Sequence, residues 1–99
     1  MSKLPIRKID YEKAVLMTDF LAKMRDSLEL NETVKFTPRI NGYQITFENE
    51  DGNIVVLLDF NKKLKAEITV NVFVNEIAEK AFISETSEDN ERIVKEILG

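Results

Sequence analysis

The sequence predicts an α+β fold, in which an N-terminal helix packs on a four-stranded antiparallel meander and a helical tail follows. Apolar residues recur at three- and four-residue steps over residues 10–30, which indicates a helix. Residues 33–75 alternate between apolar and polar side chains, with glycine-containing turns between the segments, which indicates strands joined by hairpins. The chain has 99 residues, a length for one domain with one core. We therefore expect a single domain with a basic arm at 1–9, the helix at 10–30, the sheet at 33–75 and a helical tail at 76–99.

The helix expected at 10–30 presents one apolar stripe. Asp10 can cap its first turn, since a carboxylate accepts a free backbone N–H, and Asn31 can end it in the left-handed conformation. Asp19 and Lys23 have the spacing of a favourable helical ion pair. An apolar stripe must be buried, so we expect this helix to lie across the sheet. The stripe consists of Leu16, Met17, Phe20, Leu21, Met24 and Leu28.

Two turn signals set the register of the first three strands. Asn41-Gly42 suits a type I′ turn, in which both residues need positive φ, and this turn places Phe36 opposite Phe47. Asp51-Gly52 is a second signal of the same kind, and it places Phe47 opposite Val56. Both turns put the apolar side chains of neighbouring strands on the same face.

The third connection is expected to be the loop Asn61-Lys62-Lys63, which sets Phe60 against Leu64. A loop one residue shorter would turn Glu67 onto the apolar face, because side chains alternate along a strand. The three registers then agree on one apolar face, opposite a polar face that is open to solvent. The apolar face consists of Val34, Phe36, Ile40, Tyr43, Ile45, Phe47, Ile54, Val56, Leu58, Phe60, Leu64, Ala66, Ile68, Val70, Val72 and Val74.

The two outer strands of this meander differ. Pro38 has no N–H to donate to a ladder, so the first strand is expected at an edge. In the register above, the fourth strand runs past the end of the third, and its apolar overhang has no partner. Either the C-terminal segment covers this overhang or a second chain pairs with it. The candidate self-association edge is therefore Val72, Phe73 and Val74.

The tail at 76–99 divides in two. Residues 76–83 fit either a short helix or a strand, and the spacing of Glu76 and Lys80 favours the helix. Residues 88–98 are expected to be helical, with Ser87 as the N-cap and an apolar side made of Ile93, Val94, Ile97 and Leu98.

Charge is spread unevenly over a chain of net charge −4. The arm at 1–9 carries Lys3, Arg7 and Lys8, and no apolar segment with a cleavage site follows, so no signal peptide is expected. Candidate anion contacts are Lys62, Lys63 and Lys65 at a hairpin end. The arm and this hairpin end could contact phosphate, but an acidic protein repels nucleic acid at long range.

Missing residue types exclude several kinds of chemistry. The chain has no cysteine and no histidine, so thiolate nucleophiles, zinc–thiolate sites and imidazole bases are absent. The acidic segment 49–53 contains Gly52, but the EF-hand positions around that glycine do not match, so a turn is expected there. Asp59 is expected on the polar face rather than as a buried general acid. No catalytic, cofactor-binding or metal-binding residue is predicted. No apolar segment is long enough to span a membrane, and we expect a cytoplasmic location.

Three resemblances accompany this pattern. A helix across a four-stranded meander resembles the cystatin-like layout, but the inhibitory Gln-x-Val-x-Gly is missing and Gln44 is the only glutamine, so no inhibitor role is implied. The helix–meander–helix order is similar to small dimeric nucleoid-associated DNA-binding proteins of bacteria, which have three strands. In size, in lack of motifs and in its ten Ile, ten Lys, twelve Glu and eight Asn, the chain resembles small orphan proteins of filamentous crenarchaeal viruses, which implies the host cytoplasm.

The sequence favours a non-enzymatic interaction or regulatory protein. We expect it to self-associate as a homodimer or to bind another protein. Val55, Leu57 and Phe73 could add a small apolar patch on the outer face of the sheet. The alternatives are a nucleic-acid-associated protein that uses the basic arm or the hairpin end, and a carboxylate-based enzyme. An enzyme of that kind needs two acids that converge in one pocket, and the sequence shows no such pair.

Overall fold

The fold is known from a computed structural model, which describes residues 8–28, 33–49, 52–61 and 66–99. Its elements are α1 (Lys8–Ser27), β1 (Thr33–Arg39), β2 (Gly42–Asn49), β3 (Gly52–Phe60), β4 (Ile68–Val74), β5 (Ile77–Ser84) and α2 (Ser87–Leu98). The five strands form one antiparallel sheet in the order β1-β2-β3-β4-β5. The α+β class is therefore confirmed, but the meander has five strands instead of the four that were predicted.

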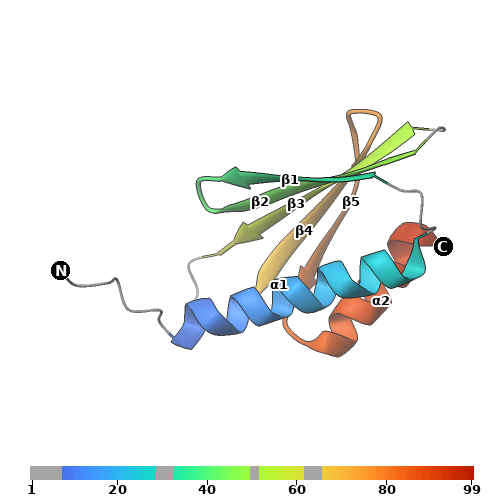
Figure 1. Cartoon of the computed structure of the whole chain (residues 1–99). Coiled ribbons are helices and arrows are strands. Elements are labelled where there is room, and N and C mark those ends of the chain that lie inside the picture. Colours follow the sequence, from blue (N-terminus) through green and yellow to red (C-terminus); the bar gives the residue numbers. More distant parts are fainter. Residues whose placement is uncertain (1–7, 29–32, 50–51, 62–65) are drawn as a thin grey trace.

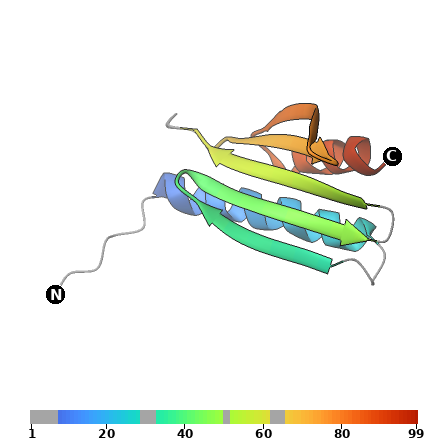
Figure 2. The same ribbon diagram turned by 90° about the horizontal axis from the view of Figure 1, so that it is seen from above.

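Both helices lie on the same face of the sheet, here called the inner face, and the other face is called the outer face (Figure 1). The view from above shows the sheet in front and both helices behind it (Figure 2). α1 packs against α2 and β4, while α2 packs against β5. The outer face is therefore left without a second layer in the described part of the chain.

The core confirms most of the predicted apolar face and the predicted helix stripe. Ile40 was predicted on that face, but it lies in the turn between β1 and β2 and is fully exposed. From α1 it takes Leu16, Phe20 and Met24, each buried. The sheet and α2 contribute Ile45, Phe47, Val56, Leu58, Ile68, Val70, Val72, Ile93 and Val94. Val34 and Phe36 lie on the same face but stay 44% and 48% exposed, because β1 is far from the strands that the helices contact.

The limits of α1 differ from the prediction. The helix begins at Lys8, so Asp10 is its third residue and not its N-cap, and it ends at Ser27. Asn31, expected to end the helix, lies outside the described residues. The predicted ion pair is confirmed, because Lys23 Nζ lies 2.9 Å from Asp19 Oδ1.

The first two predicted registers are wrong by two residues, although they place the side chains on the correct faces. Phe36 lies opposite Ile45, and Phe47 lies opposite Ile54. Gly42 and Gly52 each begin a strand instead of ending a turn. Arg39 pairs with Gly42, so Ile40 and Asn41 form the turn. Only glycine fits at this place in β2, because a Cβ there would lie 1.8 Å from the backbone oxygen of Leu58.

The third predicted register is wrong by four residues. Phe60 lies opposite Ile68, so the connection runs from residue 61 to residue 67, of which 62–65 are outside the described part. The partner of Phe60 is thus not Leu64, which lies outside the described residues. A shift by an even number of residues keeps every side chain on its face, so alternation alone does not reveal it. In this register β4 does not run past β3, because its last residue, Val74, pairs with Ile54 and β3 begins at Gly52.

Residues 77–84 form β5, so the predicted helix over 76–83 is wrong. The reason lies in the turn before it. Asn75 and Glu76 have φ of 51° and 68°, the positive values that a two-residue hairpin turn of type I′ requires at both positions. This turn reverses the chain and lays Ile77–Ser84 beside β4. A register shift between Val72 and Phe73 leaves Glu79 as the extra residue of a β-bulge.

The C-terminal helix is confirmed as α2, with its N-cap one residue earlier than predicted. Thr86 is the N-cap, and its side chain accepts a hydrogen bond from the N–H of Asp89 at 3.1 Å. In return, Asp89 Oδ2 accepts from the N–H of Glu85 at 2.9 Å. That backbone hydrogen bond is the main reason why the pKa of Asp89 lies below its ordinary value. The reciprocal bonds hold the first turn of α2 directly against the end of β5.

We predict that Gly42→Ala destabilises the fold by about 2 kcal/mol or more, because its methyl group would collide with the backbone of β3. Urea unfolding followed by circular dichroism measures this effect. The control is Asn41→Ala, which keeps the backbone carbonyl that accepts from Phe60 N at 2.7 Å and should cost less than about 1 kcal/mol. Equal stability of the two variants would contradict the steric explanation.

Candidate functional site

The outer face carries an apolar patch, here called the outer patch, on β3, β4 and β5. Its members are Val55, Leu57, Phe73, Ala78, Ala81 and Ile83. Val55 lies opposite Phe73, and Phe73 lies opposite Ala78, so the patch is continuous across three strands. Ile83 is 55% exposed. The small patch predicted from Val55, Leu57 and Phe73 is thus extended by β5, which the sequence prediction had as a helix.

The outer face becomes more polar towards β1. A hollow of about 410 Å³ crosses the face and is lined by apolar Val55, Leu57 and Phe73 and by polar side chains of β1, β2 and the β4–β5 turn, including Arg39, Gln44 and Glu76. Arg39 donates to the side-chain oxygen of Gln44 at 3.0 Å. Apolar area on this face is therefore concentrated on the β5 side.

β5 is the second uncovered feature of the sheet. It forms an edge, since the strand order ends with it, and residues 77–81 are all exposed. Ile77, on the inner face at the start of the strand, is 64% exposed. An edge strand presents unpaired backbone N–H and C=O groups to which another chain can bind.

The predicted self-association edge at Val72, Phe73 and Val74 is not an edge. These residues pair with β3 on one side and with β5 on the other, where Val72 lies opposite Lys80 and Val74 lies opposite Ile77. The overhang was inferred from a register four residues away from the observed one. Of the two predicted possibilities, the first is correct, because β5 of the C-terminal segment pairs with β4. The uncovered edge of the sheet is therefore β5 and not β4.

The candidate anion contacts Lys62, Lys63 and Lys65 lie outside the described residues, as do Lys3 and Arg7 of the basic arm. Lys8 belongs to the first turn of α1. Asp59 is exposed and lies on the outer face opposite Thr69, as predicted. In the acidic segment 49–53, Asn49 ends β2 and Gly52 begins β3, while residues 50 and 51 lie outside the described part.

A row of aromatic side chains lies on the inner face near β1. The rings of Phe36 and Tyr43 lie 4.9 Å apart, and those of Tyr43 and Phe60 lie 6.2 Å apart. Tyr43 and Phe60 also line a hollow of about 320 Å³ that includes the turn residue Ile40, which is fully exposed. The inner face therefore has an uncovered apolar area of its own, at the opposite edge from β5.

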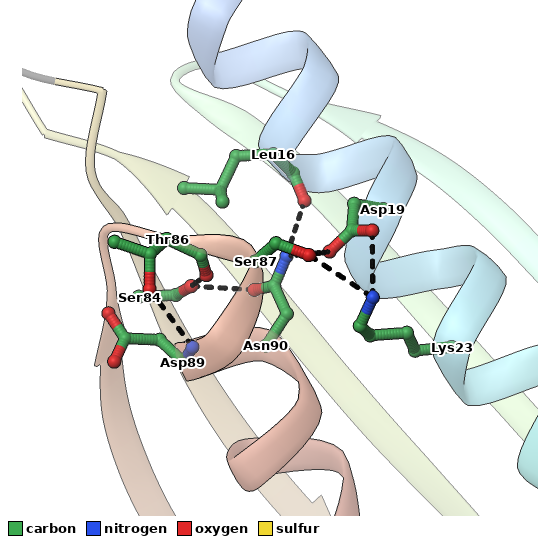
Figure 3. Close-up of polar contacts among 8 residues, drawn as sticks. All are labelled: Leu16, Asp19, Lys23, Ser84, Thr86, Ser87, Asp89 and Asn90. Carbon is green, nitrogen blue, oxygen red and sulfur yellow. Dashed lines mark hydrogen bonds and ion pairs between the residues drawn. The ribbon is translucent and has the colours of Figure 1, made fainter.

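A buried polar cluster joins α1, β5 and α2 (Figure 3). Asn90 is fully buried, accepts from Ser84 Oγ at 2.6 Å and donates to the backbone oxygen of Leu16 at 2.9 Å. It also donates to Asp19 Oδ2 at 2.8 Å. Ser87 Oγ donates to the same carboxylate oxygen at 3.0 Å. The cluster thus uses one amide side chain to hold three elements together.

Within this cluster, Ser87 and Lys23 lie 3.2 Å apart, which is the arrangement of a serine with a lysine base. A lysine base must be neutral, whereas the ammonium of Lys23 forms an ion pair with Asp19. Burial raises the pKa of Asp19, but hydrogen bonds from Asn90, Lys23 and Ser87 outweigh burial and lower it overall. Asp19 is therefore held ionised, and it pairs with Lys23. The cluster is suited to holding elements in place.

The sequence prediction missed Asn90. A signal was present, since Asn90 precedes Ile93, Val94 and Ile97 at the spacing of the apolar side of α2. A polar residue on an apolar side needs a buried hydrogen-bond partner. Its partners come from sequence-distant elements, so the pattern alone could not name them.

A second buried polar group fixes the connection between β3 and β4. Lys13 and Glu67 are both buried. The ammonium of Lys13 donates to the backbone oxygen of Asn61, and the amide of Asn61 donates to the carboxylate of Glu67. These contacts tie α1 to the connection and help to explain why it is longer than predicted.

In the described part of the chain, no group of three or more acidic side chains is placed to hold a metal ion. No helix among the described residues is long and apolar enough to cross a membrane. Comparisons with protein-family models, with curated proteins and with solved structures find no match for this chain.

We predict that Asn90→Ala destabilises the fold by about 3 kcal/mol, because it leaves buried partners without hydrogen bonds. Chemical unfolding measures the loss. Ser87→Ala, which removes an exposed hydroxyl from the same cluster, is the control and should cost less than about 1 kcal/mol. If Asn90→Ala were as stable as the wild type, the cluster would not hold the elements together.

We predict that Asp19→Asn destabilises the fold by about 1 kcal/mol near neutral pH and has little effect in acid. The pKa of Asp19 is lowered in the folded state, so its stabilising contribution is complete above the unfolded value of about 3.9 and is lost as pH falls through the folded value. Unfolding of both proteins as a function of pH tests this. Asp26→Asn, on the exposed side of α1, is the control, and a pH-independent difference for Asp19→Asn would contradict the assignment.

Proposed function

We propose that this protein is a non-enzymatic interaction protein that self-associates through the β5 side of its sheet. One observation carries the proposal: β5 is an exposed edge strand, and the outer patch reaches that edge. Backbone pairing and apolar burial are thus both possible at the same place.

The charged side chains of the described residues support a protein partner over nucleic acid. Lys35, on the outer face of β1, forms an ion pair with Glu48 at 3.3 Å, so its charge is partly neutralised. On the β5 side of the sheet, Glu76 and Glu79 accompany Lys80, so this region has no excess of positive charge. Binding to phosphates requires such an excess.

The buried polar cluster of α1, β5 and α2 supports a role other than carboxylate chemistry. A general acid needs a carboxyl group that holds a proton near neutral pH, and a carboxylate pair needs two acids in one pocket. Asp19 has a lowered pKa and is bonded to Asn90, Lys23 and Ser87. Its hydrogen-bonding capacity serves the contact between α1 and α2.

We predict that the purified chain forms a dimer at micromolar concentration, because an uncovered strand edge with adjacent apolar area favours pairing between copies. Sedimentation equilibrium over a range of protein concentrations measures the mass. A monomer at every concentration, including the highest soluble one, would overturn the proposal.

Fluorescence anisotropy with labelled duplex DNA and RNA at low salt provides the companion measurement. No binding is expected from a chain of net charge −4. Salt-sensitive binding by a chain that remains monomeric would favour the nucleic-acid alternative instead.

A further inference from the structure

Of the two edge strands, β5 is the one that can pair along its length. β1 contains Pro38, which lacks the N–H that a ladder requires. β5 has no proline between Ile77 and Ser84, and its first five residues are exposed. A second copy of the chain that adds a strand to this sheet would therefore do so at β5.

The bulge at Glu79 decides which residues of β5 share a face. Ala78 and Ala81 both lie opposite outer-face residues of β4, namely Phe73 and Asn71. Ile77 and Phe82 both lie opposite inner-face residues of β4. Without the extra residue Glu79, members of each pair would fall on opposite faces, because they are an odd number of positions apart.

We propose that β5 pairs antiparallel with β5 of a second copy in a register that sets Glu79 of each copy opposite Lys80 of the other. The same register sets Ala78 opposite Ala81 on the outer face and Ile77 opposite Phe82 on the inner face. Every directly opposed pair of apolar residues thus shares a face, as antiparallel pairing about a two-fold axis requires. The inference rests on the proposed self-association and assigns its geometry.

Charge selects this register over its neighbours. A shift by one residue in either direction sets Lys80 opposite Lys80 or Glu79 opposite Glu79. Like charges directly opposite each other destabilise a strand pair, whereas opposite charges stabilise it. The pairing also covers Ile77, which is 64% exposed.

The two charged residues are available for such a contact. Glu79 is exposed and makes no hydrogen bond or ion pair among the described contacts. Lys80 is exposed and donates to the backbone oxygen of Glu96 at 2.6 Å, which directs its amino group towards α2 while leaving further donors free. A carboxylate from a second copy can therefore reach this ammonium group.

The pairing has a consequence for the outer patch. A two-fold axis perpendicular to the sheet keeps both outer faces on the same side, so the two sheets become one continuous sheet. The outer patch of each copy extends onto β5, so the two patches meet at the centre of the assembly. Each copy alone has this apolar area at an edge, whereas the dimer would present it as one central surface.

Charge exchange tests the register. Glu79→Lys leaves two positive residues in each copy at the contact, and Lys80→Glu leaves two negative ones. We expect each single variant to weaken dimerisation roughly tenfold or more, since both symmetric contacts change from attraction to repulsion. The double variant Glu79→Lys/Lys80→Glu should dimerise like the wild type, because opposite charges face each other again.

Mixing the two single variants gives the sharpest result. Each is expected to be largely monomeric alone, and together they should form a heterodimer, since positive residues of one then face negative residues of the other. Sedimentation equilibrium on separate and mixed samples measures this. The controls are Glu12→Lys and Arg25→Glu, at exposed positions of α1, which change the net charge equally and lie outside β5. Circular dichroism establishes that all variants are folded.

The outcomes separate the two proposals. A wild type that is monomeric throughout overturns the proposed function and, with it, the register. A wild-type dimer whose single variants dimerise equally well overturns the β5 register but leaves self-association standing, at another surface such as the aromatic row of Phe36, Tyr43 and Phe60. Weakened single variants without rescue by the double variant or by mixing also overturn the register.

Discussion

Asn90 provides the contact on which the arrangement of helices and sheet depends. Its amide accepts from Ser84 at the end of β5 and donates to the backbone of α1 and to Asp19. α1 lies beside α2 and shares one apolar core with it and with the sheet, so the bonds of Asn90 to α1 help to fix where α1 lies. A fully hydrogen-bonded buried amide adds little net stability, but it fixes the relative orientation of the elements that it joins. Any other arrangement would leave its buried polar atoms without hydrogen-bond partners.

With this anchoring, α2 lies at the β4–β5 side of the inner face, and α1 lies beside it behind the middle of the sheet (Figure 2). The outer face and the β1 end of the inner face are then without cover in the described part of the chain. Val34 and Phe36 belong to the apolar face by alternation, yet they stay about half exposed for this reason. The positions of the helices thus decide which apolar residues form the core and which are open to a partner.

The bulge and the turn before β5 act together on the uncovered edge. The turn at Asn75 and Glu76 returns the chain along β4, and Glu79 then offsets the alternation of β5. The strand protects the apolar side of β4 but becomes an edge itself. Charged residues and bulges commonly prevent edge strands from pairing with other chains. In β5 the charges of Glu79 and Lys80 and the bulge also give the strand a self-complementary pattern.

The sequence by itself determined the helix stripe, the faces of the strands, the edge position of β1 and the helix at the C-terminus. These features follow from local periodicity and from the lack of an N–H in Pro38, so they need no knowledge of distant partners. The registers, the fifth strand and the position of the uncovered edge were decided only by the tertiary structure. An even register shift leaves the faces unchanged, so the alternation of apolar and polar residues cannot reveal it. The observed registers bring Gly42 close to the backbone of Leu58 and Lys13 to Asn61, contacts between residues distant in the sequence. Residues 77–84 fit both a helix and a strand, and pairing with β4 decided between the two.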